Sequence, residues 1–216
     1  MYLNFNHKFI SFIIPFIIGL ITSFSLPPYN LLIINFISFP ILFIYFVNNH
    51  KDSKWMSFKI GWIYGFGYFI SNIYWINNAL TFDEQFKILI PISFIIIPLF
   101  LGLFYGFATL ICFFFNVKKN FSSILVFAVS FSIIEFIRGS IFTGFPWNLN
   151  AYSWVQYIDF LQILSLIGTY SFNLLSITVF LIPSIFFFNI NLKVKIFYIS
   201  FTIMLHAIFL SHPIDY

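Results

Sequence analysis

The chain carries very little charge for its length. Only 7% of its 216 residues are Asp, Glu, Lys or Arg, whereas 61% are hydrophobic. A soluble domain is usually about 25% charged and about 45–50% apolar. A chain with so few polar side chains cannot cover a water-facing surface, so a soluble globular domain is excluded and a lipid environment is predicted. We expect no nucleic-acid partner.

Cysteine is also nearly absent. The single cysteine, Cys112, lies in the apolar run ATLICFFF. One cysteine excludes a disulfide within the chain and a cysteine pair for zinc or redox chemistry. We therefore interpret Cys112 as a small apolar residue that faces lipid or another helix. No metal and no cofactor are expected.

What the sequence has in abundance is long apolar stretches, and a helix needs about 20 mostly apolar residues to cross a bilayer. Seven stretches qualify, approximately Phe9–Leu26, Asn30–Val47, Phe58–Leu80, Ile90–Phe115, Phe121–Ile137, Leu161–Phe188 and Lys195–Leu210. The first has no cleavage site for a signal peptidase, so we interpret it as a retained helix. Residues 1–216 are thus expected to form a single all-α transmembrane domain, a bundle of about seven helices.

The basic residues predict an orientation in the membrane, because short cytoplasmic loops are enriched in Lys and Arg. With the N-terminus inside, the inner side holds Lys8, Lys51, Lys54, Lys59, Lys118, Lys119, Lys193 and Lys195. The outer side then holds only Lys87 and Arg138. Alternating spans produce this asymmetry without adjustment, so we expect the N-terminus inside and the C-terminus outside.

Glu135 and Arg138 are unusual because they lie at the end of an apolar run. They are separated by three positions, so they share one face of a helix and can pair. Each charge would cost about 2.5–3.5 kcal/mol near the bilayer centre and less near the interface. Two interpretations remain open. The residues form an ion pair that ends the fifth helix, or they form a polar site that faces the bundle interior or a lipid headgroup.

An aromatic segment, Gly139–Phe160, follows this pair and connects the fifth and sixth expected spans. It is too polar to cross the bilayer and too apolar to lie in water, so we place it at the outer interface, where Trp and Tyr rings concentrate. Gly144 and Pro146 predict a tight turn that presents Phe145 and Trp147 as neighbours. From the residues alone, an aromatic belt at the interface is the simpler interpretation.

Several motifs resemble those of the membrane half of apolipoprotein N-acyltransferase. The most specific are the blocks Glu135-Phe-Ile-Arg138-Gly139 and Thr143-Gly-Phe-Pro-Trp147. Weaker matches occur in the same order along the chain, at Phe24–Asn30, at Gly61–Gly67 with Tyr74-Trp75, and at Leu166–Asn173. The resemblance therefore covers most of the sequence.

This resemblance implies an enzyme of the bacterial inner membrane. Such an enzyme moves an acyl chain from a phospholipid to the N-terminal diacylglyceryl-cysteine of an apolipoprotein. In the family a nitrilase-like domain with a Glu-Lys-Cys triad performs the chemistry, and the sequence ends at Tyr216, where that domain is expected to begin. No catalytic residue can be assigned here, so we expect a membrane module that is truncated or works with a separately encoded nitrilase-like domain.

The resemblance also places a lipid-binding groove at the aromatic segment. The candidate lipid-binding residues are Glu135, Arg138, Gly144, Phe145, Pro146, Trp147 and Trp75. Phospholipid and apolipoprotein are the expected partners. A non-catalytic remnant or scaffold remains the alternative function. A transporter is disfavoured, because few ionisable residues lie within the expected spans.

Overall fold

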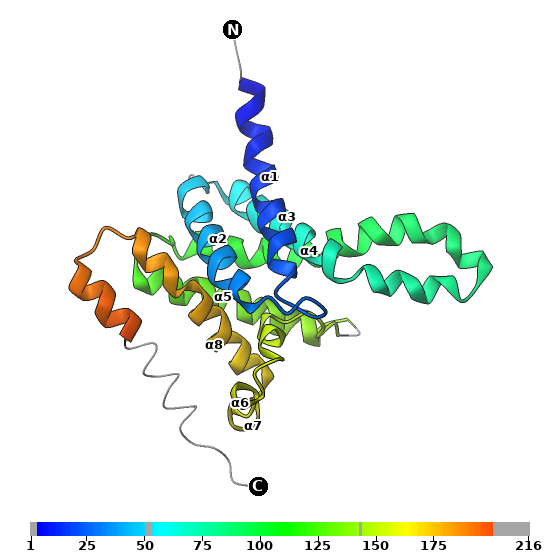
Figure 1. Ribbon diagram of the computed structural model, residues 1–216. Helices are drawn as coiled ribbons and strands as arrows, with labels where there is room; N and C mark the ends of the chain where they lie inside the picture. Colours follow the sequence, from blue (N-terminus) through cyan, green and yellow to red (C-terminus); the bar gives the residue numbers. More distant parts are fainter. Residues whose placement is uncertain (1–3, 51–52, 143, 201–216) are drawn as a thin grey trace.

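The computed structural model of the chain describes residues 4–50, 53–142 and 144–200, with side chains from residue 12 onward (Figure 1). Within these ranges every regular element is helical, which confirms the all-α class. The main helices are α1 (Asn4–Ser23), α2 (Asn35–Asn49), α3 (Lys54–Asn72), α4 (Ile90–Phe114), α5 (Phe121–Ser140) and α8 (Thr169–Leu181). The shorter elements are η1 (Leu32–Ile34), η2 (Tyr74–Thr81), η3 (Glu84–Leu89), η4 (Asn150–Trp154), α6 (Ile158–Leu161), α7 (Ile163–Ile167) and η5 (Ile182–Phe187).

Single polar residues mark where two of the long helices begin. The hydroxyl of Ser53 accepts a hydrogen bond from the backbone N–H of Met56 at 3.3 Å. The side chain of Asn120 accepts one from the backbone N–H of Ser123 at 2.8 Å. These caps satisfy N–H groups that the first turn of a helix leaves without partners. α3 and α5 therefore begin where their polar connections end.

Helix α3 lies at the centre of the bundle, between α1 and α4, with which it makes its most extensive contacts. Glycines allow this close packing. A Cβ atom added at Gly61 would lie 2.1 Å from the carbonyl oxygen of Tyr105, and one at Gly65 would lie 2.7 Å from the Cα of Gly102. Such distances are shorter than any van der Waals contact. Small residues four positions apart thus let the backbones of α3 and α4 touch, as they do in membrane helix pairs.

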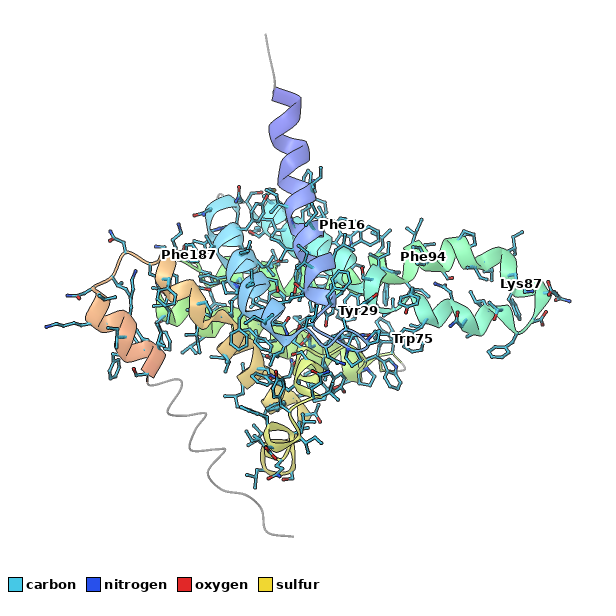
Figure 2. All side chains as sticks on the ribbon, viewed as in Figure 1. Phe16, Tyr29, Trp75, Lys87, Phe94 and Phe187 are labelled. Atoms are coloured by element: carbon cyan, nitrogen blue, oxygen red, sulfur yellow. The ribbon has the colours of Figure 1, made fainter. Side chains whose placement is uncertain are left out.

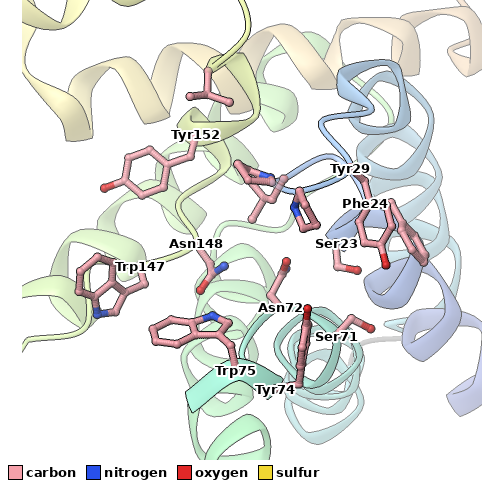
Figure 3. Close-up of a pocket in the computed structure, with 14 residues that line it drawn as sticks. Ser23, Phe24, Tyr29, Ser71, Asn72, Tyr74, Trp75, Trp147, Asn148 and Tyr152 are labelled. Carbon is pink, nitrogen blue, oxygen red and sulfur yellow. The ribbon is translucent and has the colours of Figure 1, made fainter. Parts of the chain in front are cut away.

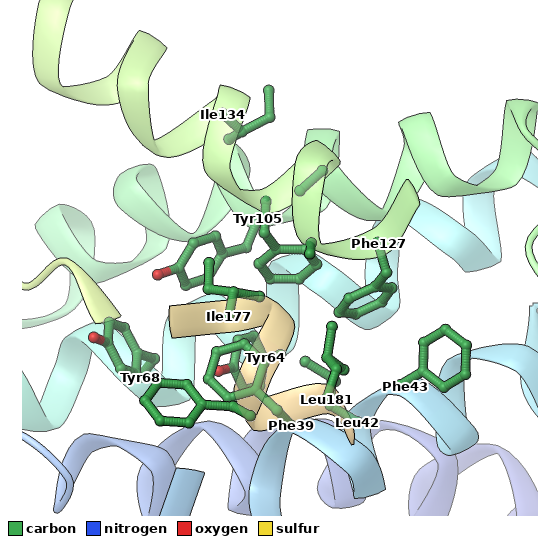
Figure 4. Close-up of a cluster of buried hydrophobic side chains, with 14 of the residues drawn as sticks. Phe39, Leu42, Phe43, Tyr64, Tyr68, Tyr105, Phe127, Ile134, Ile177 and Leu181 are labelled. Atoms are coloured by element: carbon green, nitrogen blue, oxygen red, sulfur yellow. The ribbon is translucent and has the colours of Figure 1, made fainter. Parts of the chain in front are cut away.

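The core between the helices is largely aromatic (Figure 4). Tyr105 of α4 packs against Phe131 of α5, with ring centroids 5.2 Å apart, and Phe43 of α2 packs edge-on against Phe127 of α5 at 5.4 Å. Aromatic pairs in these arrangements contribute more than their buried area alone. The cluster joins α2, α3, α4, α5 and α8 into one body.

The outward faces of the helices are apolar and exposed. On α5 the exposed apolar side chains recur at intervals of three or four residues, at Leu125, Val129, Ile133 and Phe136. α1 carries the same kind of stripe at Ile13, Ile17 and Ile21. A helix with an apolar face on both its inner and outer sides is suited to lipid rather than water. The bundle is therefore a transmembrane one.

The expected spans correspond to the helices only in part. Four helical segments in the described part of the chain are long and apolar enough to cross a membrane: Leu32–Asn49, Glu84–Phe114, Phe121–Ser140 and Thr169–Phe187. The third expected span, Phe58–Leu80, is interrupted, because α3 ends at Asn72 and continues as the 3-10 helix η2. The sixth, Leu161–Phe188, is divided at Gly168. The seventh lies partly outside the described residues, so the number of spans stays a prediction.

Residues 74–97 form an arm that projects from the bundle (Figures 1 and 2). It contains η2, η3 and the beginning of α4. Its apolar side chains, including Phe82 and Ile88, are exposed, whereas Lys87 and Glu84 near its tip form a salt bridge. The arm thus combines an apolar body with a charged end.

Candidate functional site

The candidate site is organised around the connection between α5 and α6, residues 141–157 apart from residue 143, which we call the site loop. Gly144 begins its ordered turn with a φ of 73°, a conformation that L side chains rarely adopt. A Cβ atom there would also lie 2.8 Å from the carbonyl oxygen of Gly139. The backbone N–H of Phe145 then donates to the carbonyl of Arg138 at 3.1 Å. The turn is therefore folded back onto the end of α5.

Arg138 holds this turn from inside the bundle. Its Nη1 donates to the carbonyl oxygens of Phe145 at 2.8 Å and Trp147 at 2.9 Å. Its guanidinium lies between the rings of Phe69, 5.1 Å from the centroid, and Phe145, 5.7 Å from the centroid. Only 1% of the residue is exposed. Arg138 thus stabilises the loop through hydrogen bonds and cation–π contacts.

Glu135 lies one turn earlier in α5 and is 0% exposed. Its Oε1 accepts hydrogen bonds from the hydroxyl of Tyr105 at 2.6 Å and from the amide of Asn150 at 2.9 Å. Its Oε2 accepts one from the amide of Asn173. Burying a carboxyl group is costly unless hydrogen bonds replace its hydration. Here three neutral donors from α4, the site loop and α8 supply them.

The ion-pair interpretation of Glu135 and Arg138 is not the arrangement found. The two side chains form no direct salt bridge, and each has its own set of neutral partners. The fifth helix also continues to Ser140, beyond its expected end at Ile137, so both residues lie inside the helix. Both side chains face the bundle interior, because the loop folds over the end of α5 and covers them.

A cavity of about 690 Å³ lies beside the site loop, and we call it the loop pocket (Figure 3). Three separate segments line it: residues 23–29 between α1 and α2, residues 71–75 at the end of α3, and residues 147–155 of the site loop. Trp75 and Trp147 lie side by side in its wall, with ring centroids 6.4 Å apart in an edge-to-face contact. Two predicted site residues from distant parts of the sequence therefore meet in one cavity.

Two amide groups in the wall of the loop pocket have no hydrogen-bond partner in the protein. They are Nδ2 of Asn72, a donor, and Oδ1 of Asn148, an acceptor. The backbone carbonyl of Asn148 is held by the hydroxyl of Tyr68 at 2.9 Å. Buried polar groups in proteins are normally paired. The two free amide groups can therefore bind polar atoms of a ligand.

Tyr152 contributes a hydroxyl at the edge of the same pocket. Partial burial raises the pKa of Tyr152, so its hydroxyl stays protonated at neutral pH and can donate a hydrogen bond. In the structure it reaches the carbonyl of Pro146 at 3.4 Å. No three His, Cys, Asp or Glu side chains gather as a metal site in the part of the chain that the structure describes. The site is thus suited to a ligand with apolar parts and a few polar atoms.

The predicted site residues fall into three groups. Trp75 and Trp147 line the loop pocket, while Gly144, Phe145 and Pro146 shape the turn beside it. Glu135 and Arg138 lie beneath the turn. Sequence reasoning missed the other polar residues of the site, which are Asn72, Tyr105, Asn148, Asn150 and Asn173. Their signal was present in part, since an isolated amide in an apolar stretch must find a partner.

The part of the chain that forms this site is also the part that matches known proteins. Residues 18–182 match the family model described as "Apolipoprotein N-acyltransferase N-terminal domain". A protein of Brucella melitensis biotype 1 named "Apolipoprotein N-acyltransferase" is 34% identical over 179 residues, which cover 79% of this chain and 33% of that protein. Proteins of the same name from Sinorhizobium medicae and Rhodopseudomonas palustris are each 32% identical over 180 residues.

The chain spans about a third of the length of these curated relatives, 33% in each case. The matched residues include all seven predicted site residues, the turn and the loop pocket. The resemblance seen in the motifs is thereby confirmed over most of the chain. The chain belongs to the apolipoprotein N-acyltransferase family, and it corresponds to the family's N-terminal domain.

Proposed function

We propose that the chain is the membrane module of an apolipoprotein N-acyltransferase. In this role it holds a phospholipid while a nitrilase-like domain transfers one acyl chain to the N-terminal diacylglyceryl-cysteine of a lipoprotein. The ester bond of the phospholipid breaks, an amide bond forms on the α-amino group, and a lysophospholipid leaves. The observation that carries the proposal is the loop pocket, where Trp75 and Trp147 face two free amide groups.

The composition of the loop pocket suits an acyl donor. Its volume of about 690 Å³ lies within the range of about 300–1,000 Å³ that is usual for small-molecule sites. The rings of Trp75 and Trp147 and the adjoining prolines offer apolar surface to acyl chains. The amides of Asn72 and Asn148 offer a donor and an acceptor to the ester and glycerol oxygens. A bilayer lipid has this combination of apolar chains and a polar end.

The predicted orientation agrees with this role. Lysine counting places three connections on the outer side, namely those between the first and second, third and fourth, and fifth and sixth expected spans. Segments bordering these three connections meet at the loop pocket. The same topology puts the C-terminus on that side. We therefore place the pocket at the outer face of the inner membrane, where a nitrilase-like domain would reach it.

A photoreactive phospholipid tests the lipid site directly. The purified chain in detergent is labelled with a phospholipid that carries a diazirine on one acyl chain, and the labelled peptides are mapped by mass spectrometry. We expect labelling of residues 71–75 and 147–155 that an excess of unlabelled diacyl phospholipid removes. Trp147→Ala should lower it about tenfold, the effect of losing one large aromatic contact of about 1.4 kcal/mol. Cys112→Ser, which alters a buried residue of α4 that does not line the loop pocket, is the control.

Labelling of the outward stripe of α5 measures contact with bulk detergent and lipid. The lipid site would be contradicted if the labelling that unlabelled phospholipid removes were no greater at the loop pocket than at Ile133.

A chimera then separates an enzyme module from a scaffold. In it, the matching N-terminal third of the Brucella relative is replaced by this chain. Acyl transfer to a diacylated lipopeptide that is lost in the Trp147→Ala chimera supports the module, and an inactive chimera that still binds phospholipid favours the scaffold.

A further inference from the structure

Between Phe145 and Ser153, the site loop forms hydrogen bonds to the helices of the bundle at almost every second residue. The partners come from four helices. Three backbone carbonyls of the loop accept hydrogen bonds: those of Phe145 and Trp147 from Arg138, and that of Asn148 from Tyr68. Further along, Asn150 donates to Glu135, the N–H of Ala151 donates to Asn173, and Asn35 donates to the hydroxyl of Ser153. Connecting segments usually run over the protein surface and are more mobile than the elements that they join. Here the polar contacts lie along the middle, beneath the residues that form the pocket wall.

Glu135 is the centre of these contacts. Its carboxyl group joins Tyr105 of α4, Asn173 of α8 and Asn150 of the site loop. Asn173 reaches the loop a second time, because its Oδ1 accepts the backbone N–H of Ala151 at 2.9 Å. We call these four side chains the carboxyl network. All four are buried, so the network replaces most of the hydration that Glu135 loses.

Trp147 has little packing of its own to hold it. Its side chain is 54% exposed, and its ring contact is with Trp75, which is itself exposed. The next residue, Asn148, has a φ of 58°, which costs about 1 kcal/mol for a residue with a side chain. The position of the indole therefore follows from the position of the backbone, and the backbone is held from beneath.

We propose that Tyr105, Asn150 and Asn173 are positioning residues, which act through Glu135 to hold Trp147 in the wall of the loop pocket. The proposal rests on the proposed function in one respect, that the pocket is where the lipid binds. Arg138 binds the carbonyl of Trp147 itself, and Tyr68 binds the carbonyl of the next residue, Asn148. The carboxyl network fixes Asn150 and Ala151 in the segment that follows. Loss of its hydrogen bonds frees the loop on one side of Trp147.

Fluorine NMR of the chain labelled with fluorotryptophan tests this directly. The chain has five tryptophans, which give one resonance each and are assigned by single Trp→Phe variants. Asn150→Leu removes a donor to Glu135 with little change of volume, and Tyr105→Phe removes one hydroxyl. We expect both variants to shift or broaden the Trp147 resonance. The Trp55 resonance, at the opposite end of α3, should stay unchanged.

Tyr64→Phe is the matched control. Tyr64 is as deeply buried as Tyr105 and packs against it at 5.5 Å, but its hydroxyl does not bind Glu135. It should leave the Trp147 resonance in place. An unchanged Trp147 resonance in both network variants overturns the proposal. So does a loss of all resonances together in Tyr105→Phe, which would show a general structural role. Tyr105→Phe removes a single oxygen and disturbs the packing least. It therefore tests the positioning role even if Asn150→Leu does not fold.

The labelling of the loop pocket by the photoreactive phospholipid supplies a second readout. Each lost hydrogen bond should weaken this labelling about threefold to tenfold. The melting temperature of each variant should fall below that of Tyr64→Phe, because buried Glu135 loses a donor, so labelling is compared at a temperature where all variants are folded. The two proposals can fail separately. If the wild-type chain shows no competable labelling, the lipid site is wrong, while the Trp147 resonance still decides whether the carboxyl network positions the loop. Normal labelling in both network variants overturns the positioning role.

Discussion

Two glycines, Gly144 and Gly168, both have a positive φ but different surroundings. Gly144 has a φ of 73° and Gly168 a φ of 76°. A Cβ atom at Gly144 would meet the carbonyl oxygen of Gly139 at 2.8 Å, whereas one at Gly168 would meet no atom within 4 Å. Alanine substitutions at the two positions therefore distinguish the free-energy cost of a positive φ from the cost of a steric clash between the added Cβ and the backbone.

We expect Gly168→Ala to lower the free energy of unfolding by about 1–3 kcal/mol, because its φ of 76° and ψ of 165° lie in a region that is essentially restricted to glycine. Gly144→Ala should lower it by about a further 1–3 kcal/mol, because the backbone carbonyl of Gly139 cannot move away without disturbing α5. The measurement is thermal unfolding in detergent. Unfolding is monitored by the reaction of a thiol-specific dye with Cys112, which is fully buried in the folded chain. Equal losses in the two variants would show that the turn at Gly144 has room for a methyl group.

The residues of the site could be predicted from the sequence only where their signal is local. Glu135 and Arg138 share a helix face because of their spacing, and that relation holds. Their partners do not follow from spacing, because Phe69 and Asn173 come from helices far away in the chain. The direct ion pair was the simplest way to offset both charges. The fold instead provides neutral donors, carbonyls and rings that no sequence interval predicts.

At the level of helices, the contact between α3 and α4 depends on backbone proximity. The Cβ of a residue at position 61 would clash with the backbone carbonyl of Tyr105 at 2.1 Å and with the hydroxyl of Thr109 at 2.2 Å. At Gly106 of α4 the nearest atoms belong to the ring of Phe58, at 2.8 Å. A backbone cannot yield without moving a helix, whereas a ring can rotate.

Gly61→Ala should therefore destabilise the chain by about 3 kcal/mol, the upper end for an overpacked core, and Gly106→Ala by about 1 kcal/mol. Circular dichroism should show unchanged helix content in both variants, because the damage is to packing and not to helix formation. The melting temperature of each variant in detergent gives the comparison. A larger loss of stability for Gly106→Ala than for Gly61→Ala would mean that the closest contact between α3 and α4 is at Phe58 and Gly106, not at Gly61.

The sequence predicted helix type well and helix continuity less well. A run of apolar residues such as Leu161–Phe188 predicts one long helix, since hydropathy carries no information about backbone angles. Gly168, with a φ of 76° and a ψ of 165°, divides that run into α7 and α8. α3 ends at Asn72 without a positive φ, since the next residue, Ile73, has a φ of −115°, and η2 then leads into the arm. One break lies at the loop pocket, which Asn72 lines, and the other precedes α8, the helix that carries Asn173. Irregular backbone is tolerated in membrane helices where it lines a cavity.

For the whole molecule, the open question is which side of the membrane the loop pocket faces. The lysine distribution predicts the N-terminus inside and the pocket outside. We expect alkaline phosphatase fused after Tyr216 to be active in a bacterial host, and the same enzyme fused after Lys119, between α4 and α5, to be inactive. The reverse pattern would invert the topology, and activity at both positions would mean an even number of spans between them.

The fastening of the site loop limits how the site can be moved. The described part of the site loop has short turns of its own, but partners on other helices hold its backbone at Phe145, Asn148 and Ala151. The loop is consequently not a portable motif. A graft into another helical bundle would carry the aromatic rings without the pocket unless Tyr68, Glu135, Arg138 and Asn173 were rebuilt with it. In a designed transferase the unit of exchange is therefore the whole helical domain.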